Sequence, residues 1–208
     1  FFLGPSGSFK TTVGLCATTL FAEQPRVPAA SFNDTTGALR EKLSRSHGRV
    51  LLVDDFRPPC SAAERSRLNT SLEELVRLVG DSNERARLSA NSKIVTSSRP
   101  QGALLVTGEI TSGSESSMLR CLTVTVKKGE VSSDILADFT RDPLILSSHL
   151  NHFLLWAGNH GSEIINIIQT SSGSFRELFV DCAKEPRHRG IGVTLHTMAL
   201  LLLWYLCD

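Results

Sequence analysis

A glycine-rich segment near the start of the chain constrains the fold more than any other feature. It reads Gly-Pro-Ser-Gly-Ser-Phe-Lys-Thr from Gly4 to Thr11, with a short apolar run before it and an apolar-periodic stretch after it. This order predicts a buried strand, a tight loop and a helix. A phosphate-binding loop needs that context, because loop N–H groups and the helix N-terminus hold the phosphate oxygens together.

The segment matches the phosphate-loop pattern G-x-x-x-x-G-K-[ST] at Gly4, Lys10 and Thr11. In this pattern the lysine reaches the β and γ phosphates, and the hydroxyl is a ligand of Mg²⁺. Phe9 stands where the second glycine belongs. Phe9 is an obstacle if the position needs a backbone conformation reserved for glycine, but not if the position merely opens the helix. A chance glycine-rich turn is the alternative. The residues expected to bind the nucleotide are Gly4, Pro5, Ser6, Gly7, Ser8, Phe9, Lys10, Thr11 and Thr12.

Two adjacent carboxylates end a later apolar run. Residues 49–53 are rich in valine and leucine, and Asp54 and Asp55 follow directly. This is the pattern of a central parallel strand that delivers acids at its carboxyl end. We expect Asp54 to hold Mg²⁺ together with Thr11, and Asp55 to orient or activate water. The alternative is a solvated strand end that happens to carry two acids.

The polar end of another predicted strand and one arginine are further candidates for contact with the nucleotide. The apolar run 103–106 ends in Thr107, Gly108 and Glu109, so a polar side chain there could contact water or the γ-phosphate, unless the segment is a simple turn. Arg120 precedes the last strand-like run and could reach phosphate oxygens of its own or a neighbouring subunit. An ordinary surface arginine is the alternative. The residues to which we assign catalytic roles are Lys10, Asp55, Thr107 and Arg120.

Four basic residues, Arg85, Arg87, Lys93 and Arg99, share one stretch that has few large apolar groups. We expect residues 81–101 to form a loop or a β excursion. The stretch contains no aromatic residue on which a base could stack, which favours contact with nucleic-acid phosphates over base reading. A solvated loop is the alternative.

The apolar patterns also predict the architecture. The strand-like runs are residues 1–3, 29–32, 49–55, 103–106 and 121–126. Helical periodicity is found at residues 13–21, 35–45, 61–79, 135–139, 144–156, 164–168, 175–182 and 191–206, and residues 113–117 are expected to form a loop. We expect an α/β fold, a three-layer P-loop NTPase with a mostly parallel five-stranded sheet in the order 5-1-4-3-2 and a helical C-terminal extension. The expected domains are residues 1–130 for the core, truncated at its N-terminus, and residues 131–208 for the extension.

Composition indicates the cellular compartment and the kinds of partner that we expect. The chain of 208 residues is 41% hydrophobic with a net charge of +1, which is typical of a folded soluble protein and not of a DNA-coating protein. Five cysteines without a CxxC pair predict reduced thiols in the cytoplasm. The apolar stretch 195–207 is interrupted by His196 and Thr197 and is short for a membrane span. We expect a buried helix there, or a helix that lacks its downstream packing partner.

Three stretches resemble the ATPase domain of bacterial primase-helicase-type replication proteins of plasmids, phages and integrated elements. They are residues 4–11, 30–39 and 51–56, and the likeness continues through Thr107-Gly108-Glu109 to the last helix. The resemblance implies an AAA+/RecA-like, ring-forming ATPase that uses ATP and Mg²⁺ and unwinds or translocates along DNA. Relatives tend to carry a second arginine just before Arg120, where this chain has Met118.

The function expected from the sequence is therefore ATP binding and hydrolysis by a P-loop domain of a DNA helicase or translocase in replication of a mobile element. Expected partners are single-stranded or forked DNA and further copies in a homo-oligomeric ring. One alternative is a P-loop ATPase that acts as a switch without helicase activity. Another is a degenerate nucleotide-binding module, disabled by Phe9, that only mediates protein contacts.

Overall fold

The computed structural model describes residues 1–21, 28–81, 86–88, 94–96, 100, 102–111, 114–142, 144–180 and 185–208. These residues divide into two compact units, Phe1–Ser147 and Ser148–Asp208. The sequence-based boundary after residue 130 stays a prediction. The first compact unit extends beyond that boundary to include α5 (Ser133–Arg141), which packs against α1 (Lys10–Thr19).

A parallel sheet forms the centre of the first unit. Its strands, in spatial order, are β2 (Ala30–Ser31), β3 (Val50–Phe56), β6 (Ala103–Gly108), β1 (Phe2–Leu3) and β7 (Val124–Thr125). Each neighbouring pair is parallel in the described residues, so the carboxyl ends of the strands lie at one edge. In chain order this is 5-1-4-3-2, and the predicted topology is confirmed.

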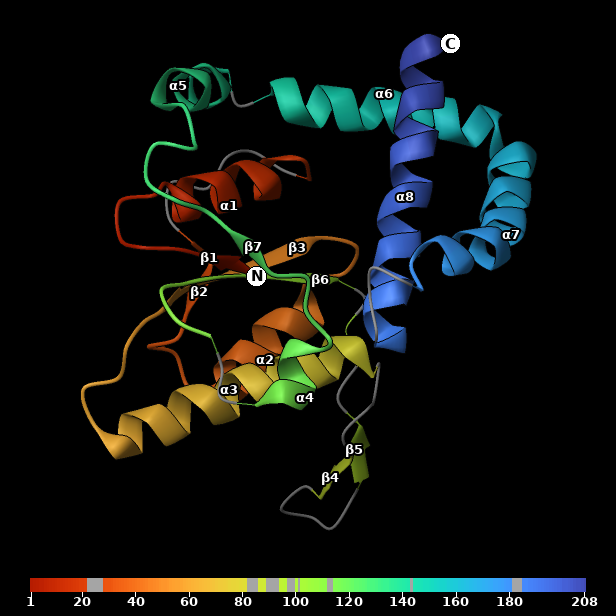
Figure 1. Ribbon diagram of the computed structural model, residues 1–208. Coiled ribbons are helices and arrows are strands. Elements are labelled where there is room, and N and C mark those ends of the chain that lie inside the picture. Colours follow the sequence, from red (N-terminus) through yellow and green to blue (C-terminus); the bar gives the residue numbers. More distant parts are fainter. Residues whose placement is uncertain are drawn as a thin grey trace. The chain divides into compact units, whose positions relative to one another are not determined.

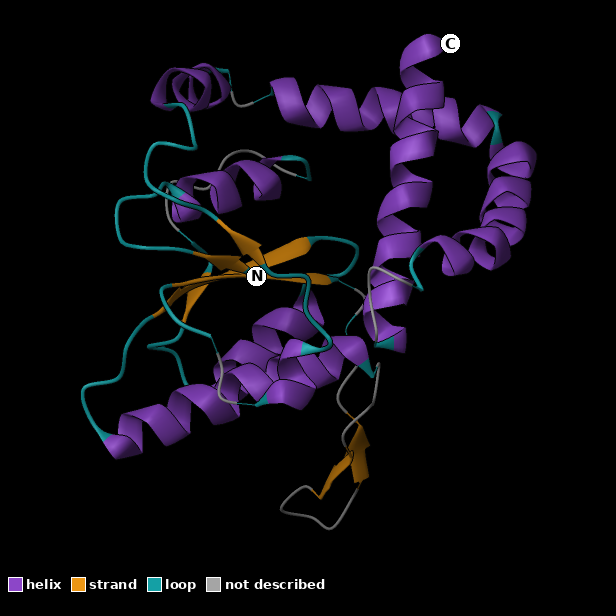
Figure 2. Ribbon diagram, viewed as in Figure 1, coloured by secondary structure: helices purple, strands orange, loops and turns teal. Residues whose placement is uncertain are grey.

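Helices cover both faces of this sheet (Figure 1). On one face, α1 packs against β1, β3 and β6. The helices of the opposite face are α2 (Thr36–Arg45), α3 (Ala62–Gly80) and α4 (Glu115–Met118). Figure 2 shows the sheet between the two helical layers. The first unit is thus the three-layer α/β fold that the sequence predicts.

Side-chain caps fix where two of these helices begin. The Thr35 hydroxyl accepts a hydrogen bond from the N–H of Ala38 at the start of α2. At the start of α3, the Ser61 hydroxyl accepts from the N–H of Glu64, and the Glu64 carboxylate accepts in turn from the N–H of Cys60. These bonds satisfy N–H groups that have no partner inside the helix.

The core lies between the sheet and the pair α2 and α3. Strand β3 contributes Leu51, Val53 and Phe56, each nearly or fully buried. Leu39 of α2 and Leu72 of α3 belong to the same apolar cluster. Burial on both faces explains why β3 reads as a continuous apolar run instead of an alternating one.

Two local predictions are wrong. Residues 113–117 were expected to form a loop, but α4 begins at Glu115. A helix this short gives no periodicity that a sequence pattern can reveal. Residues 164–168 and 175–182 were expected to be separate helices, but α7 (Gly161–Leu178) continues through both the intervening residues and the first part of the second segment. Packing of α7 on α8 (Pro186–Cys207) outweighs the low helix propensity of the serine-rich and glycine-containing part between them.

The second unit contains most of α6 (Ile145–Asn159), together with α7 and α8. Aromatic rings join α6 to the end of α8, where Trp156 packs edge-on against Trp204 and lies next to Tyr205. The Trp156 indole N–H also donates to a carboxylate oxygen of Asp208 at 2.8 Å. The cluster therefore holds α6 and the last turn of α8 together within this unit.

Helix α8 is longer than the sequence suggested, since it begins at Pro186 and has 22 residues. Only 11% of its apolar window is buried within the described residues, so the expectation of a buried helix is wrong. Among the described residues, α8 is the one helix long and apolar enough to cross a membrane by length and composition. Core helices of soluble proteins meet the same description, so the feature assigns no location.

Candidate nucleotide-binding site

The glycine-rich loop connects β1 to α1 at the carboxyl edge of the sheet. The N–H of Gly4 donates to the carbonyl oxygen of Gly108 at 3.1 Å, which ties the loop to the tip of β6. A side chain on Gly4 would collide with the carbonyl oxygen of Val126, directly after β7. Gly7 has a φ of +77°, a conformation that favours glycine. Both glycines are thus required by the path of the loop.

Lys10 is folded into this loop. Its ammonium donates to the carbonyl oxygen of Pro5 at 2.7 Å and to the Ser8 hydroxyl at 3.4 Å. The Ser8 hydroxyl donates to the same Pro5 oxygen at 2.9 Å. Lys10 and Ser8 are both buried. The first turn of α1 therefore has a positive charge beside N–H groups that lack intrahelical partners, which is an arrangement that can hold phosphate.

Phe9, which stands at the second glycine of the phosphate-loop pattern, adopts a backbone conformation that favours glycine. Its φ is +63° and its ψ is +15°, in the left-handed helical region. Its side chain is 43% exposed. The position therefore has a glycine-like backbone even though a phenylalanine occupies it. Of the two conditions considered in the sequence analysis, the first, a backbone conformation that favours glycine, is the one found here.

A cluster of hydroxyl and carboxylate groups lies next to the loop. The Thr11 hydroxyl donates to Oδ1 of Asp54 at 2.9 Å, and the Thr107 hydroxyl donates to the same oxygen. Thr107 is fully buried at the tip of β6. Hydroxyl groups from two residues that are far apart in the sequence therefore donate to one carboxylate oxygen of Asp54, at the carboxyl ends of β3 and β6.

An irregularity in β3 sets the position of Asp55. Val53 pairs with Val106 and Phe56 pairs with Gly108, so β3 has one residue more than β6 across this interval. Such a bulge locally bends a strand and re-aims its side chains. Asp55 takes a φ of +69° within the bulge. In a regular strand, Asp54 and Asp55 would instead point to opposite faces of the sheet.

The surroundings of Asp55 alter its acidity. Partial burial raises the pKa of Asp55, and the negative charges of Asp54 and Glu109 raise it further. The Arg57 guanidinium, with its Nε 3.7 Å from Oδ2 of Asp55, lowers this pKa and partly offsets the other effects. A carboxylate whose pKa is raised accepts a proton more readily than an exposed aspartate does.

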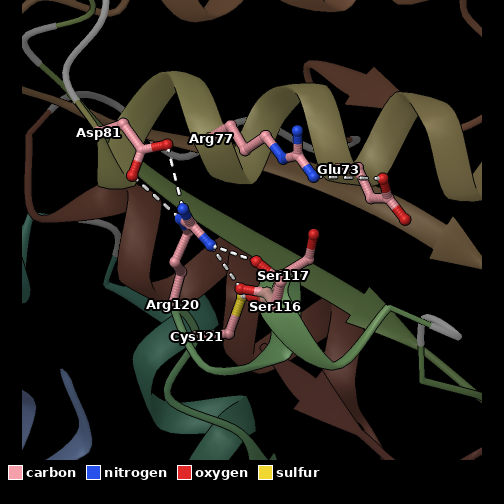
Figure 3. A network of polar contacts seen from close by, with 7 residues as sticks. All are labelled: Glu73, Arg77, Asp81, Ser116, Ser117, Arg120 and Cys121. Carbon is pink, nitrogen blue, oxygen red and sulfur yellow. Dashed lines mark hydrogen bonds and ion pairs between the residues drawn. The ribbon is translucent and has the colours of Figure 1, made fainter. Parts of the chain in front are cut away.

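Arg120 lies apart from this cluster. Its guanidinium makes a two-pronged contact with Asp81 at the end of α3, with Nε 3.0 Å from Oδ1 and Nη2 3.2 Å from Oδ2 (Figure 3). Its Nη1 donates to the carbonyl oxygen and the hydroxyl of Ser116. In this conformation Arg120 links α3 to α4, and it does not contact the phosphate loop of its own chain. A contact with a neighbouring subunit stays a prediction.

The structure places one of the basic candidates. Arg87 lies in β4 (Ala86–Leu88), which pairs with β5 (Ile94–Thr96) as an antiparallel hairpin. The β excursion predicted for residues 81–101 is therefore present. Arg85, Lys93 and Arg99 lie outside the described residues.

Two charged residues near the site were missed by the sequence analysis. Arg57 follows β3 and contacts Asp55, and Lys128 follows β7 and approaches Gly7. Both lie just beyond the carboxyl end of a predicted parallel strand. The rule that identified Asp54 and Thr107 would have identified these two residues if it had been applied to every strand end.

Comparisons with known proteins bear on the fold. No protein-family model matches the sequence, and no curated protein matches it. Among solved structures, an active helicase, Cch of SCCmec type IV, is similar with a TM-score of 0.65 and 17% sequence identity. The likeness covers 97% of this chain and 37% of the helicase chain. At this level of identity the comparison shows a helicase-like fold, and this chain corresponds to a part of that helicase.

Proposed function

We propose that this protein binds ATP with Mg²⁺ and hydrolyses it, as the motor domain of a DNA helicase or translocase of the primase-helicase type. The observation that carries the proposal is the cluster of Thr11, Asp54 and Thr107 beside the loop that holds Lys10. Triphosphate hydrolysis requires a cation, loop N–H groups and hard oxygen ligands at one place, and all three occur at this edge of the sheet.

The residues present fit a magnesium ion. The Thr11 hydroxyl and the Asp54 carboxylate are hard oxygen donors 2.9 Å apart, and Mg²⁺ in phosphate-transfer sites takes a few protein oxygens of this kind together with phosphate oxygens. When bound, the ion neutralises charge on the β and γ phosphates. Thr107 holds the Asp54 carboxylate in place from the neighbouring strand.

The other roles are assigned by charge and position. Lys10 neutralises negative charge that develops on the phosphates. Asp55 accepts a proton from the attacking water or orients that water, since its pKa is raised by burial and by neighbouring carboxylates. Both residues belong to elements that end or begin at the same sheet edge, so their positions are fixed by the fold.

Three features favour a DNA motor over a switch. The fold is like that of an active helicase. The hairpin of β4 and β5 is an additional β element that follows both nucleotide motifs in the chain and precedes β6. It belongs to the basic stretch of the sequence. The resemblance to replication ATPases of mobile elements implies the same activity. A ring of several copies in the cytoplasm is part of this proposal.

Phosphate release measured with Lys10→Ala tests the hydrolysis. We expect turnover of MgATP to fall by about a hundredfold or more, because the substitution removes a positive charge that stabilises the transition state. Lys42→Ala is the matched control, since Lys42 belongs to α2, where it pairs with Asp34, and its turnover should equal that of the unchanged protein. Undiminished turnover in Lys10→Ala, with normal thermal unfolding, would exclude the assignment.

Unwinding is tested separately with a labelled forked DNA duplex and MgATP. Strand separation that requires ATP, with hydrolysis stimulated by DNA and strongly weakened by salt, supports the motor. Hydrolysis that DNA does not affect would instead support the switch. Failure to bind a labelled ATP analogue would support the degenerate interaction module.

A further inference from the structure

The turn that follows β7 lies against the phosphate loop. The N–H of Val126 donates to the carbonyl oxygen of Leu3 at 2.7 Å, and the carbonyl of Val126 is the group that excludes a side chain on Gly4. Because β7 pairs with β1 and α5 packs on α1, both ends of the segment 126–132 are attached to the elements that flank the loop. The elements that hold the phosphate loop therefore also hold both ends of this turn.

The conformation of the turn is fixed from within. The Glu130 carboxylate accepts a hydrogen bond from the N–H of Lys127 at 2.8 Å, and the N–H of Glu130 donates back to the carbonyl oxygen of Lys127 at 3.3 Å. Gly129 supplies the positive φ of +84° that reverses the chain. These bonds hold Lys128 at the apex between Lys127 and Gly129.

The two lysines of the turn differ in their surroundings. The Lys127 ammonium is 3.9 Å from a carboxylate oxygen of Glu130, and its side chain is largely exposed. The Lys128 side chain extends to the phosphate loop, and its Cε lies 3.9 Å from the position that a Cβ of Gly7 would take. Within the described part of the chain, no carboxylate pairs with Lys128. Its positive charge is thus placed at the middle of the loop, on a segment separate from Lys10.

We propose that Lys128 contacts the polyphosphate of the bound nucleotide and is a second cationic ligand of the site, contributed by the same chain as Lys10. This inference rests on the proposed function, since it requires a polyphosphate in the loop. Lys128 approaches the loop at Gly7, where the loop backbone carries no side chain. A lysine acts here as a mobile point charge, which suits phosphate oxygens that need no fixed fork geometry.

Binding of a fluorescent ATP analogue with Mg²⁺ tests this contact in Lys128→Ala, with Lys127→Ala as the matched control. We expect Lys128→Ala to weaken binding about tenfold, at the lower end of what a hydrogen bond to a charged group contributes. Lys127→Ala removes the same charge from the same turn, so it should change the affinity less than twofold. Lys128→Arg should retain most of the affinity.

The outcomes separate this inference from the proposed function. If the unchanged protein binds no nucleotide, the proposed function fails. If Lys10→Ala loses binding but Lys128→Ala binds normally, only the role of Lys128 is overturned. Equal weakening by Lys127→Ala and Lys128→Ala would also overturn it, because it would indicate a general charge effect. Thermal unfolding without nucleotide should be the same for all three turn variants.

Discussion

Phe9 shows how the phosphate loop constrains a single residue. A side chain in the left-handed helical region costs about 1–2 kcal/mol, because its Cβ approaches the following carbonyl oxygen. Phe9 accepts this conformation because the residues on both sides are fixed, with Gly4 tied to Gly108 and Lys10 tied to Pro5. The loop therefore keeps its path without the second glycine, at a cost in stability.

Replacing Phe9 by glycine should release this strain. We expect Phe9→Gly to be more stable to unfolding than Phe9→Ala by about 1 kcal/mol, because alanine keeps the Cβ that causes the strain. Thermal or urea unfolding of the two variants measures the difference. The comparison cancels the loss of the aromatic ring, which both variants share. Equal stability of the two variants would show that the backbone at this position is not strained.

Asp55 is a second residue whose conformation and chemistry are linked. It has a positive φ within the bulge of β3, and the charges of Asp54, Glu109 and Arg57 act on its carboxylate. Its pKa is raised, chiefly by burial. A carboxylate that accepts a proton must be ionised, so activity should be lost as the pH falls through the pKa of Asp55. Because that pKa lies above the ordinary value of 3.8, the loss should begin at a higher pH than for an exposed aspartate.

The pH dependence of MgATP turnover measures this effect. Glu109→Gln removes a negative neighbour and should shift the acid limb of the profile to lower pH. Arg57→Gln removes the positive neighbour and should shift the same limb to higher pH. Asp55→Asn, which tolerates the left-handed conformation, should lower turnover by about a hundredfold or more while leaving nucleotide binding intact. Shifts of the same sign in Glu109→Gln and Arg57→Gln would contradict the assignment.

At the scale of elements, Arg120 connects the end of α3 to α4. Its side chain is 12% exposed, and its contacts with Asp81 and Ser116 use several donors of the guanidinium. Partly buried, two-pronged ion pairs of this kind contribute more than exposed ones do. The pair sets the position of the short helix that precedes β7, which explains the arginine without any contact to phosphate.

A double-mutant cycle with Arg120→Ala and Asp81→Ala separates the structural role of Arg120 from a catalytic one. We expect a coupling energy of about 1–2 kcal/mol in the free energy of unfolding, because the side chains contact each other directly. If the role is only structural, both single variants should affect ATP turnover equally. A much larger loss of turnover in Arg120→Ala than in Asp81→Ala would support the predicted contact with a neighbouring subunit.

At the scale of the whole molecule, the net charge of the chain is only +1. Attraction to DNA must therefore come from a local cluster of basic residues and not from the overall charge. The basic stretch that includes the hairpin of β4 and β5 is the segment we expect to contact DNA phosphates. Phosphate contacts by basic side chains release counterions, so the affinity for DNA should fall steeply as salt increases. The nucleotide site, at the carboxyl edge of the sheet, consists of other residues and should be independent of these charges.

A variant in which the basic stretch is neutralised tests this expectation. Its substitutions are Arg85→Ala, Arg87→Ala, Lys93→Ala and Arg99→Ala. We expect unchanged ATP turnover without DNA and no stimulation by DNA. The salt dependence of binding to single-stranded DNA should become shallower, by about 0.7 in slope for each phosphate that the variant no longer neutralises. The control instead replaces surface arginines of helices α2, α3 and α5 by alanine, namely Arg45, Arg65, Arg77 and Arg141. Equal loss of DNA stimulation in both variants would show that the effect follows net charge and not the basic stretch.

The local pattern of the chain determined most of the elements and their order. Strand β3 was predictable because burial on both faces leaves a continuous apolar run, and α2 and α3 because their caps are encoded by Thr35 and Ser61. Lys10, Thr11 and Asp54 were predictable as a group, since parallel strands bring their carboxyl ends to one edge. Helix α4 was not predictable, because four residues are too few to show a period.

Tertiary structure alone decided the finer geometry of the site. The bulge that positions Asp55 depends on pairing with β6, the partner of Arg120 lies on α3, and Lys128 meets Gly7 only because β7 pairs beside β1. The strand-end rule places Lys128 at this edge of the sheet, but it does not reveal which residue each of these side chains contacts. Short-range sequence patterns determine which elements form, whereas the direction of a single charged side chain is determined by what the neighbouring elements leave free around it.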